Sequence, residues 1–201
     1  DVNKLVLSNQ VHKDSIQYIT KDDIGKGIHR KSDILDVDGL MTDVKGIGLV
    51  TFYADCVPLL FYDPVHHAIA SSHAGWRGTV LKIGAKTIKE MEAKFNTNAK
   101  DVIVGIGPSI GFCCYEVSAD VKKEFDLSFN DDIIAKVTKP VGDKYYLDLQ
   151  EVNKLTLIEC GVNPLNIETS ELCTKCHKER FFSHRVMGVS RGSQVAIMAL
   201  K

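Results

Sequence analysis

The sequence has almost no net charge and no long hydrophobic run. Its 25 lysines and arginines nearly balance 26 aspartates and glutamates, which leaves a net charge of −1 over 201 residues. This nearly equal number of positive and negative charges argues against a nucleic-acid-binding protein that works through an overall basic field. No apolar run approaches the roughly 20 residues that a helical membrane span needs. We therefore expect neither a nucleic-acid partner nor a membrane partner.

Targeting signals, repeats and a disulfide framework are also missing. No signal peptide is visible, and because the chain begins at Asp1 without methionine, we expect a native N-terminal stretch to be missing. A chain of this size buries enough surface to need no disulfide staples. The six cysteines are irregularly spaced, at positions 56, 113, 114, 160, 173 and 176. They predict free thiols in a reducing, cytoplasmic compartment, with a metal as one use for them.

Strand-like and helix-like patterns alternate along the chain. The expected strands are 47–54, 58–62, 68–73, 101–106 and 165–169, with a terminal hairpin formed by 180–187 and 194–200. The expected helices are 80–95, 118–126 and 149–160. This order predicts an α/β (α+β) fold, in a single domain with a mixed, largely antiparallel sheet.

One expected hairpin brings a thiol and an imidazole together. If Pro64 and Val65 form a two-residue loop, Cys56 lies opposite His73, and opposed side chains share one face with Cβ atoms about 5 Å apart. Such a pair can bind one metal ion, whereas a slip of one residue would separate the two side chains. The alternative is a buried cysteine and a histidine at a strand end. Pro58 lacks an N–H, which predicts an edge strand or a bulge.

The segment after His73 carries the chain's single tryptophan. Trp76 lies beside Arg77 and between two glycines, which permit close backbone approach to a ligand. A guanidinium can hold phosphate or carboxylate at two points, and free N–H groups of a helix starting near Thr79 favour an anion. The alternative is a tight turn in which Trp76 packs in the core and Arg77 is solvated.

Several short segments form a distinctive set along the chain. They are Asn-Gln-Val-His at 9–12, Ala-Asp-Cys-Val-Pro at 54–58, His-Ala-Gly-Trp-Arg-Gly at 73–78, Gly-Pro-Ser-Ile-Gly at 107–111 with Cys-Cys-Tyr-Glu-Val at 113–117, and Phe-Phe-Ser-His-Arg at 181–185. With these segments in this order, the chain resembles the YfiH/YlmD family. Its members were once described as multicopper polyphenol oxidases (laccase domain proteins) and later as purine nucleoside phosphorylases with adenosine deaminase activity. The resemblance covers nearly the whole chain. It implies one YfiH-like domain over 1–201, layered α-β-β-α.

The resemblance implies a zinc site formed by His12, Cys56 and His73. His12 enters through the resemblance alone, because spacing does not place it. Three protein ligands leave a fourth position open, as a catalytic zinc requires. Lys13 stands where the family usually has glycine, and His184 where it usually has tyrosine. An N-terminal segment of some tens of residues, with an Arg-x-Gly-Gly loop, is expected to be absent.

The implied activity is phosphorolysis of adenosine- or inosine-type nucleosides together with deamination of adenosine. Zinc, with copper as the other candidate ion, would lower the pKa of bound water toward about 7. We expect Cys56, Asp55 and Arg77 to be catalytic, with Asp55 as a proton carrier or orienting group. Trp76, Arg77 and Arg185 are expected to contact purine nucleoside and phosphate. The sequence does not set the oligomeric state.

Two other functions compete with this one. A copper-dependent polyphenol oxidase typically needs many imidazoles in His-x-His pairs, and the chain has seven histidines but no such pair. A metal-stabilised binding module without catalysis is the third hypothesis. An open coordination position and Arg77 beside it argue against that module.

The remaining cysteines carry weaker signals. Cys173 and Cys176 form a C-x-x-C string that could bind a structural zinc with Cys160, although an incidental cysteine-rich loop is favoured. We expect this pair not to bind the catalytic metal. Cys113 and Cys114 are expected to be buried thiols, with a nucleophile as the alternative.

Overall fold

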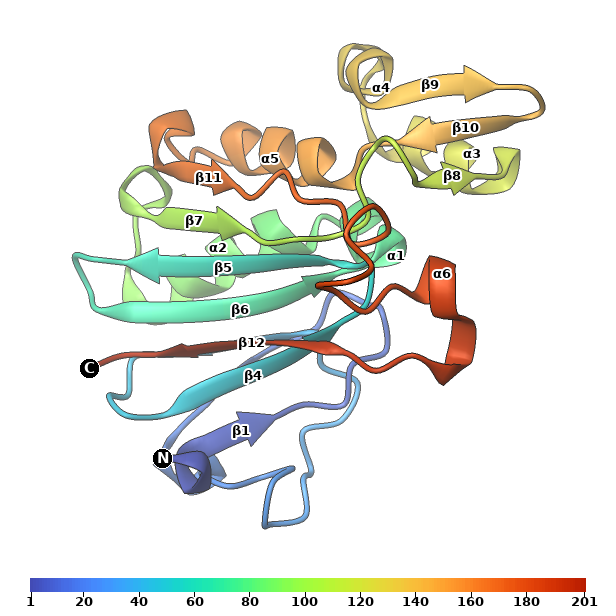
Figure 1. The fold of residues 1–201 in the computed structure, drawn as a ribbon. Helices are drawn as coiled ribbons and strands as arrows, with labels where there is room; N and C mark the ends of the chain where they lie inside the picture. Colours follow the sequence, from blue (N-terminus) through green and yellow to red (C-terminus); the bar gives the residue numbers. More distant parts are fainter.

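A six-stranded sheet forms the centre of the molecule in a computed structural model that describes all 201 residues (Figure 1). Its strand order is β11-β7-β5-β6-β3-β2. The strands are β2 (Ile16–Tyr18), β3 (Gly39–Thr42), β5 (Val57–Asp63), β6 (Ala68–Ala74), β7 (Ile103–Ile106) and β11 (Ile167–Thr169). Every residue of β6 is buried, as expected for a strand covered on both faces.

A smaller sheet and a set of helices cover the two faces of this central sheet. The smaller sheet has the order β1-β4-β12, formed by β1 (Leu5–Leu7), β4 (Gly48–Tyr53) and β12 (Gln194–Ala199). The helices are α1 (Trp76–Val80), α2 (Ile83–Phe95) and α5 (Leu149–Glu159). Strand alternation in β6 divides the core: Ala68 and Ala70 join the cluster that holds the helices, whereas Ile69 joins the cluster between the sheets.

A third, small sheet lies at one end of the molecule. It has the order β8-β10-β9 and consists of β8 (Glu116–Val117), β9 (Thr138–Val141) and β10 (Lys144–Leu147). Two helices, α3 (Ala119–Ser128) and α4 (Asp131–Val137), accompany it, and α6 (His184–Met187) lies nearer the central sheet (Figure 1). Short 3-10 turns occupy Val2–Lys4, Lys21–Asp23, Ala99–Asp101, Pro164–Asn166 and Gly188–Ser190. No helix combines the length and the apolar character needed to cross a membrane.

The expected fold class is confirmed. Six of the nine strand pairings are antiparallel, so the sheets are mixed and largely antiparallel. The expected layering was α-β-β-α. Its two sheet layers and one helical layer are present, because helices cover the outer face of the larger sheet. The outer face of the smaller sheet has no helix over it and keeps Phe52, Val195 and Ile197 exposed.

One expected element was wrong, and another begins later than expected. The helix expected over 80–95 is α2, which begins at Ile83, because the left-handed φ of 57° at Lys82 separates it from α1. The expected terminal hairpin does not form: β12 pairs with β4, and residues 180–187 form no strand. Part of that segment is helix α6 instead.

The register expected for the β5–β6 hairpin was also wrong, by two positions. The turn has four residues, 64–67, so Pro58 rather than Cys56 lies opposite His73. A shift of two keeps every side chain on its face, because the alternation has a period of two. Pro58 lies in a central strand, not at an edge. Its carbonyl accepts from the N–H of Gly107 (2.9 Å), just past the end of β7, so its missing donor interrupts no ladder.

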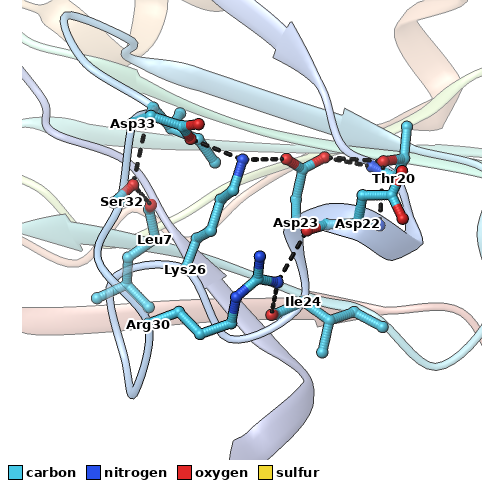
Figure 2. Close-up of polar contacts among 10 residues, drawn as sticks. Leu7, Thr20, Asp22, Asp23, Ile24, Lys26, Arg30, Ser32 and Asp33 are labelled. Carbon is cyan, nitrogen blue, oxygen red and sulfur yellow. Dashed lines mark hydrogen bonds and ion pairs between the residues drawn. The ribbon is translucent and has the colours of Figure 1, made fainter.

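A charge network fixes the loop between β2 and β3 (Figure 2). Lys26 Nζ lies 2.9 Å from Asp23 Oδ1 and 2.6 Å from Asp33 Oδ1. Ser32 Oγ donates to the carbonyl of Leu7 (3.3 Å), and Leu7 N–H donates to the carbonyl of Lys26 (3.0 Å). The loop is therefore tied to β1, which leads directly into the candidate site.

Candidate metal centre

Three metal-binding side chains meet at one end of β6. His73 lies near the end of that strand, Cys56 immediately precedes β5, and His12 lies in the loop after β1. Their ligand atoms all lie within 4.8 Å of one another. His73 is buried between the sheets, Cys56 is half-buried and His12 is exposed. The group therefore extends from the interior to the surface, where a ligand can reach it.

Asp38 holds two of these residues in place. Its carboxylate is fully buried and accepts from His73 Nδ1 at 2.9 Å. It also accepts from the backbone N–H groups of Val11 (3.1 Å), His12 (2.9 Å) and Lys13 (2.8 Å). Because a carboxylate can only accept, the Nδ1 of His73 carries the hydrogen and its Nε2 is left for an ion.

The backbone around the group adopts conformations that need support. His12 has φ 60° and Asp55 has φ 81°, in the left-handed region that costs a non-glycine residue about 1–3 kcal/mol. The three backbone donors to Asp38 hold the His12 loop in this conformation. At Gly75 a Cβ atom would lie 3.2 Å from Cys56 Sγ and 3.0 Å from the His12 ring. Glycine therefore allows the backbone to approach the group.

The ionisation of Cys56 favours metal binding, whereas His73 gives up a proton when an ion binds. Burial alone would raise the pKa of Cys56, but hydrogen bonding and charge from His12 and His73 lower this pKa to about 6. Burial alone would lower the pKa of His73, but Asp38 and Cys56 raise it to about 9. A sulfur that ionises near pH 6 is thiolate at neutral pH, which is the form that binds metals. Two imidazoles and a thiolate suit a tetrahedral ion with one open position.

A cleft of about 520 Å³ opens beside the metal centre. It is lined by His12 and Cys56 on one side and by further aromatic and cationic side chains: Trp76, Arg77, Tyr115, His184, Arg185 and Arg191. The guanidinium of Arg77 lies 4.3 Å from the centre of the Trp76 ring, and that of Arg185 lies 5.3 Å from the centre of the Tyr115 ring. The cleft therefore offers positive charge and flat apolar surface together.

Asp55 joins three segments that form the wall of the cleft. Its Oδ1 accepts from Thr174 Oγ1 (2.6 Å), and its Oδ2 accepts from the backbone N–H of Arg185 (2.7 Å). Its carbonyl accepts from the N–H of Ile110 (2.9 Å). Both carboxylate oxygens are thus engaged in holding neighbouring segments, which favours an orienting role over proton transfer.

The structure places the residues expected from the sequence in two adjoining groups. His12, Cys56 and His73 form the metal centre, and Asp55, Trp76, Arg77 and Arg185 line the cleft. The helix expected near Thr79 begins earlier, at Trp76, so Arg77 lies in its first turn. Trp76 packs against the core, as the alternative reading expected, and also lines the cleft.

Sequence reasoning missed Asp38, Tyr115 and Arg191. Asp38 precedes β3 in an ordinary Asp-Val-Asp-Gly stretch, and nothing local marks it as the acceptor for a histidine 35 residues later. Arg191 follows α6, where a strand was expected to turn. The Phe-Phe-Ser-His-Arg resemblance that drew attention to Arg185 stops short of it.

Comparison with known proteins identifies the family. The family model described as multi-copper polyphenol oxidoreductase laccase matches residues 1–201. The purine nucleoside phosphorylase YlmD of Bacillus subtilis (strain 168) is 36% identical over 203 residues, an alignment that covers 100% of this chain and 72% of YlmD. The crystal structure of YfiH from Bacillus licheniformis has a TM-score of 0.95 at 35% identity, covering 100% of this chain and 76% of that one. YlmD from Geobacillus stearothermophilus has a TM-score of 0.91 at 34% identity, covering 100% and 74%. The chain belongs to the YfiH/YlmD family of laccase-domain proteins.

Proposed function

We propose that this chain is a zinc-dependent enzyme that splits purine nucleosides with phosphate and also deaminates adenosine. The observation that carries the proposal is a metal-ready group, His12, Cys56 and His73, that opens into a cleft lined by arginines and aromatic rings. The name of the Bacillus subtilis relative, a purine nucleoside phosphorylase, supports the same substrate class.

The cleft has the size and the side chains for a nucleoside with phosphate. A volume of about 520 Å³ lies within the range of small-molecule sites. Trp76 and Tyr115 offer flat faces to a purine, and Arg77 and Arg185 offer planar forks that match phosphate oxygens. Because each guanidinium rests against an aromatic ring, its fork is oriented before the anion arrives.

The metal-binding residues and their neighbours are proposed to have different chemical roles. His12, Cys56 and His73 would hold a zinc ion, which would supply a Lewis acid able to lower the pKa of water toward about 7. Asp38 accepts a hydrogen bond from Nδ1 of His73, so Nε2 is the ring nitrogen that would face the ion. Burial and the charge of Cys56 raise the pKa of Tyr115, so its hydroxyl stays protonated as a donor in the cleft.

Two bond exchanges are expected in the cleft. In phosphorolysis a phosphate oxygen bonds to the anomeric carbon while the bond to the purine nitrogen breaks, which gives ribose 1-phosphate and free base. In deamination, oxygen from water bonds to C6 of adenosine and ammonia leaves. Arg77 and Arg185 hold phosphate for the first reaction, and Asp55 keeps Arg185 at the cleft through its backbone.

Copper-dependent phenol oxidation is the second candidate, because the description of the matching family model names it. Of the two groups of three or more candidate metal ligands, only that of His12, Cys56 and His73 contains imidazoles. A four-electron reduction of dioxygen needs several coppers in close array, and His-x-His pairs that would hold them are absent from the sequence. The nucleoside reaction therefore fits these residues better.

The test is product analysis of the zinc-loaded protein with adenosine or inosine, with and without phosphate. We expect release of free base and ribose 1-phosphate that depends on phosphate, and release of ammonia from adenosine. Arg77→Ala should raise the KM for phosphate at least about tenfold. Arg180→Ala, which alters an exposed arginine outside the cleft, should behave as the wild type. Oxygen consumption with a phenol, and no attack on nucleosides, would support the second candidate instead.

A further inference from the structure

A second group of metal-binding side chains lies outside the candidate metal centre. The Sγ atoms of Cys113, Cys114, Cys173 and Cys176 all lie within 4.8 Å of one another. The first two belong to the loop between β7 and β8, and the other two to the segment between β11 and α6. Cys160, which the sequence offered as one partner for the C-x-x-C pair, is not part of the group. Cys113 is exposed and Cys114 is half-buried, so the expectation of two buried thiols was wrong. Four sulfurs from two distant loops thus converge on one point.

The sulfur separations match a single tetrahedral ion. Cys176 Sγ lies 3.6 Å from Cys113 Sγ and 3.5 Å from Cys114 Sγ. Zinc–sulfur bonds of about 2.3 Å in a tetrahedron place the sulfurs about 3.8 Å apart. A disulfide would need about 2.05 Å, and all four thiols are free. A cluster with several irons would hold its cysteines farther apart than a single ion does.

The backbone around the sulfurs is arranged to receive charge. Gly111 N–H donates to Cys173 Sγ at 3.2 Å, a contact that stabilises a thiolate. A Cβ at Gly111 would lie 3.1 Å from Cys173 Cβ and 3.4 Å from Cys113 Sγ, so glycine permits this approach. The two loops are already paired, because Thr174 N–H donates to the carbonyl of Ser109 (2.9 Å).

We propose that Cys113, Cys114, Cys173 and Cys176 bind a structural zinc ion that clamps the two loops together. Four protein thiolates complete a tetrahedron and leave no open position, which is the pattern of a structural rather than a catalytic site. Thiolate ligands in this geometry select zinc or a single iron among the common ions, and zinc carries no redox liability. The proposal is independent of the proposed nucleoside activity, because it rests on different residues.

The clamp lies directly behind the wall of the cleft. Thr174, between the two cysteines of the C-x-x-C pair, donates its hydroxyl to Asp55 at 2.6 Å. Ile110, three residues before Cys113, donates its N–H to the carbonyl of Asp55 at 2.9 Å. Asp55 in turn precedes Cys56 of the metal centre. Loss of the clamp should therefore loosen the cleft wall and lower thermal stability without removing a ligand of the metal centre.

Cobalt substitution of the wild-type protein gives the first test. Co²⁺ bound by four thiolates should give strong visible ligand-field bands and sulfur-to-cobalt charge-transfer bands. His12→Ala should keep these bands, because it alters the other site. The double variant Cys113→Ser/Cys176→Ser should lose them, and Cys160→Ser is the matched control that should keep them. Zinc content should be about two ions per wild-type chain and about one in the double variant.

Alkylation of the wild-type protein tests the same site without relying on a variant that folds. In reducing buffer with Zn²⁺, peptide mapping should show these four cysteines alkylated at least about tenfold more slowly than after chelation. Cys160 should show no such dependence on zinc. The proposal would be overturned if the four cysteines were alkylated at the same rate with and without zinc. It would also be overturned if the cobalt bands were only as strong as those of a site with one thiolate ligand, or if a disulfide formed among these cysteines in that buffer.

Discussion

Replacing Asp38 by asparagine removes charge from the carboxylate that organises the metal centre while keeping its volume. Oδ1 accepts from the N–H of His12 and from His73 Nδ1, and Oδ2 accepts from the N–H groups of Val11 and Lys13. In asparagine one oxygen becomes NH₂, so two donors lose their acceptor whichever way the amide turns. At about 1–3 kcal/mol for each unsatisfied donor, Asp38→Asn should lower the free energy of unfolding by about 2–6 kcal/mol.

The same change should weaken metal binding. If the amide NH₂ of the asparagine faces His73, Nδ1 must accept a hydrogen bond instead of donating one. The ring then adopts the tautomer in which Nε2 carries the hydrogen and offers no lone pair to a metal. We expect zinc affinity to fall about 10–100-fold, the usual effect of losing a group that orients a histidine ligand. Competition with a chelating dye measures this affinity, and urea unfolding in excess chelator measures the loss of stability separately.

A matched control and the effect of pH sharpen the test. The control is Asp36→Asn. Asp36 is exposed, lies two residues before Asp38 and has a left-handed conformation that asparagine tolerates equally, so this variant should keep the stability and zinc affinity of the wild type. Hydrogen bonds outweigh burial and hold the pKa of Asp38 below its usual range. Its contribution is therefore present above pH of about 4 and is lost as pH falls through the folded-state pKa. An Asp38→Asn protein that binds zinc and unfolds like the wild type would refute the reasoning.

Three further predictions concern the thiols and the anion site. In chelated protein, Cys56 should alkylate with a midpoint near pH 6, because its pKa is lowered to about 6; a midpoint near the ordinary cysteine value would contradict this. By the same shift, zinc binding at this centre should weaken as pH falls below about 6. Arg77→Ala should raise the KM for phosphate at least about tenfold and leave zinc binding intact, with Arg77→Lys restoring part of the loss; unchanged phosphate kinetics would remove Arg77 from the mechanism. Replacing Cys173 and Cys176 by serine should leave zinc at the His–Cys centre, as anomalous diffraction would show, and an empty centre would prove the assignment wrong.

Much of the fold was predictable because it depends on local periodicity. The helical spacing of apolar residues located α2, α3 and α5, and the apolar runs located β5, β6 and β7. Cys56 and His73 still share a face although the expected register was wrong, because an error of two positions preserves the face of a strand. An error of one would have placed the two side chains on opposite faces.

The rest depends on contacts between distant segments. Asp38 acquires its role when the loop that carries His12 folds over it, and spacing does not record that contact. The four-cysteine group joins loops about sixty residues apart, so neither Cys113-Cys114 nor the C-x-x-C string reveals it alone. The 180–187 segment has strand-like composition, yet it forms no strand and its last four residues form helix α6.

The most direct test of the central claim is a cycle of metal removal and return, followed by release of hypoxanthine from inosine in the presence of phosphate. Chelated protein should lose this activity, and stoichiometric Zn²⁺ should restore it in the wild type and in Asp36→Asn but not in His12→Ala. Undiminished, phosphate-dependent release by metal-free protein, or by His12→Ala without zinc at the His–Cys centre, would contradict the claim.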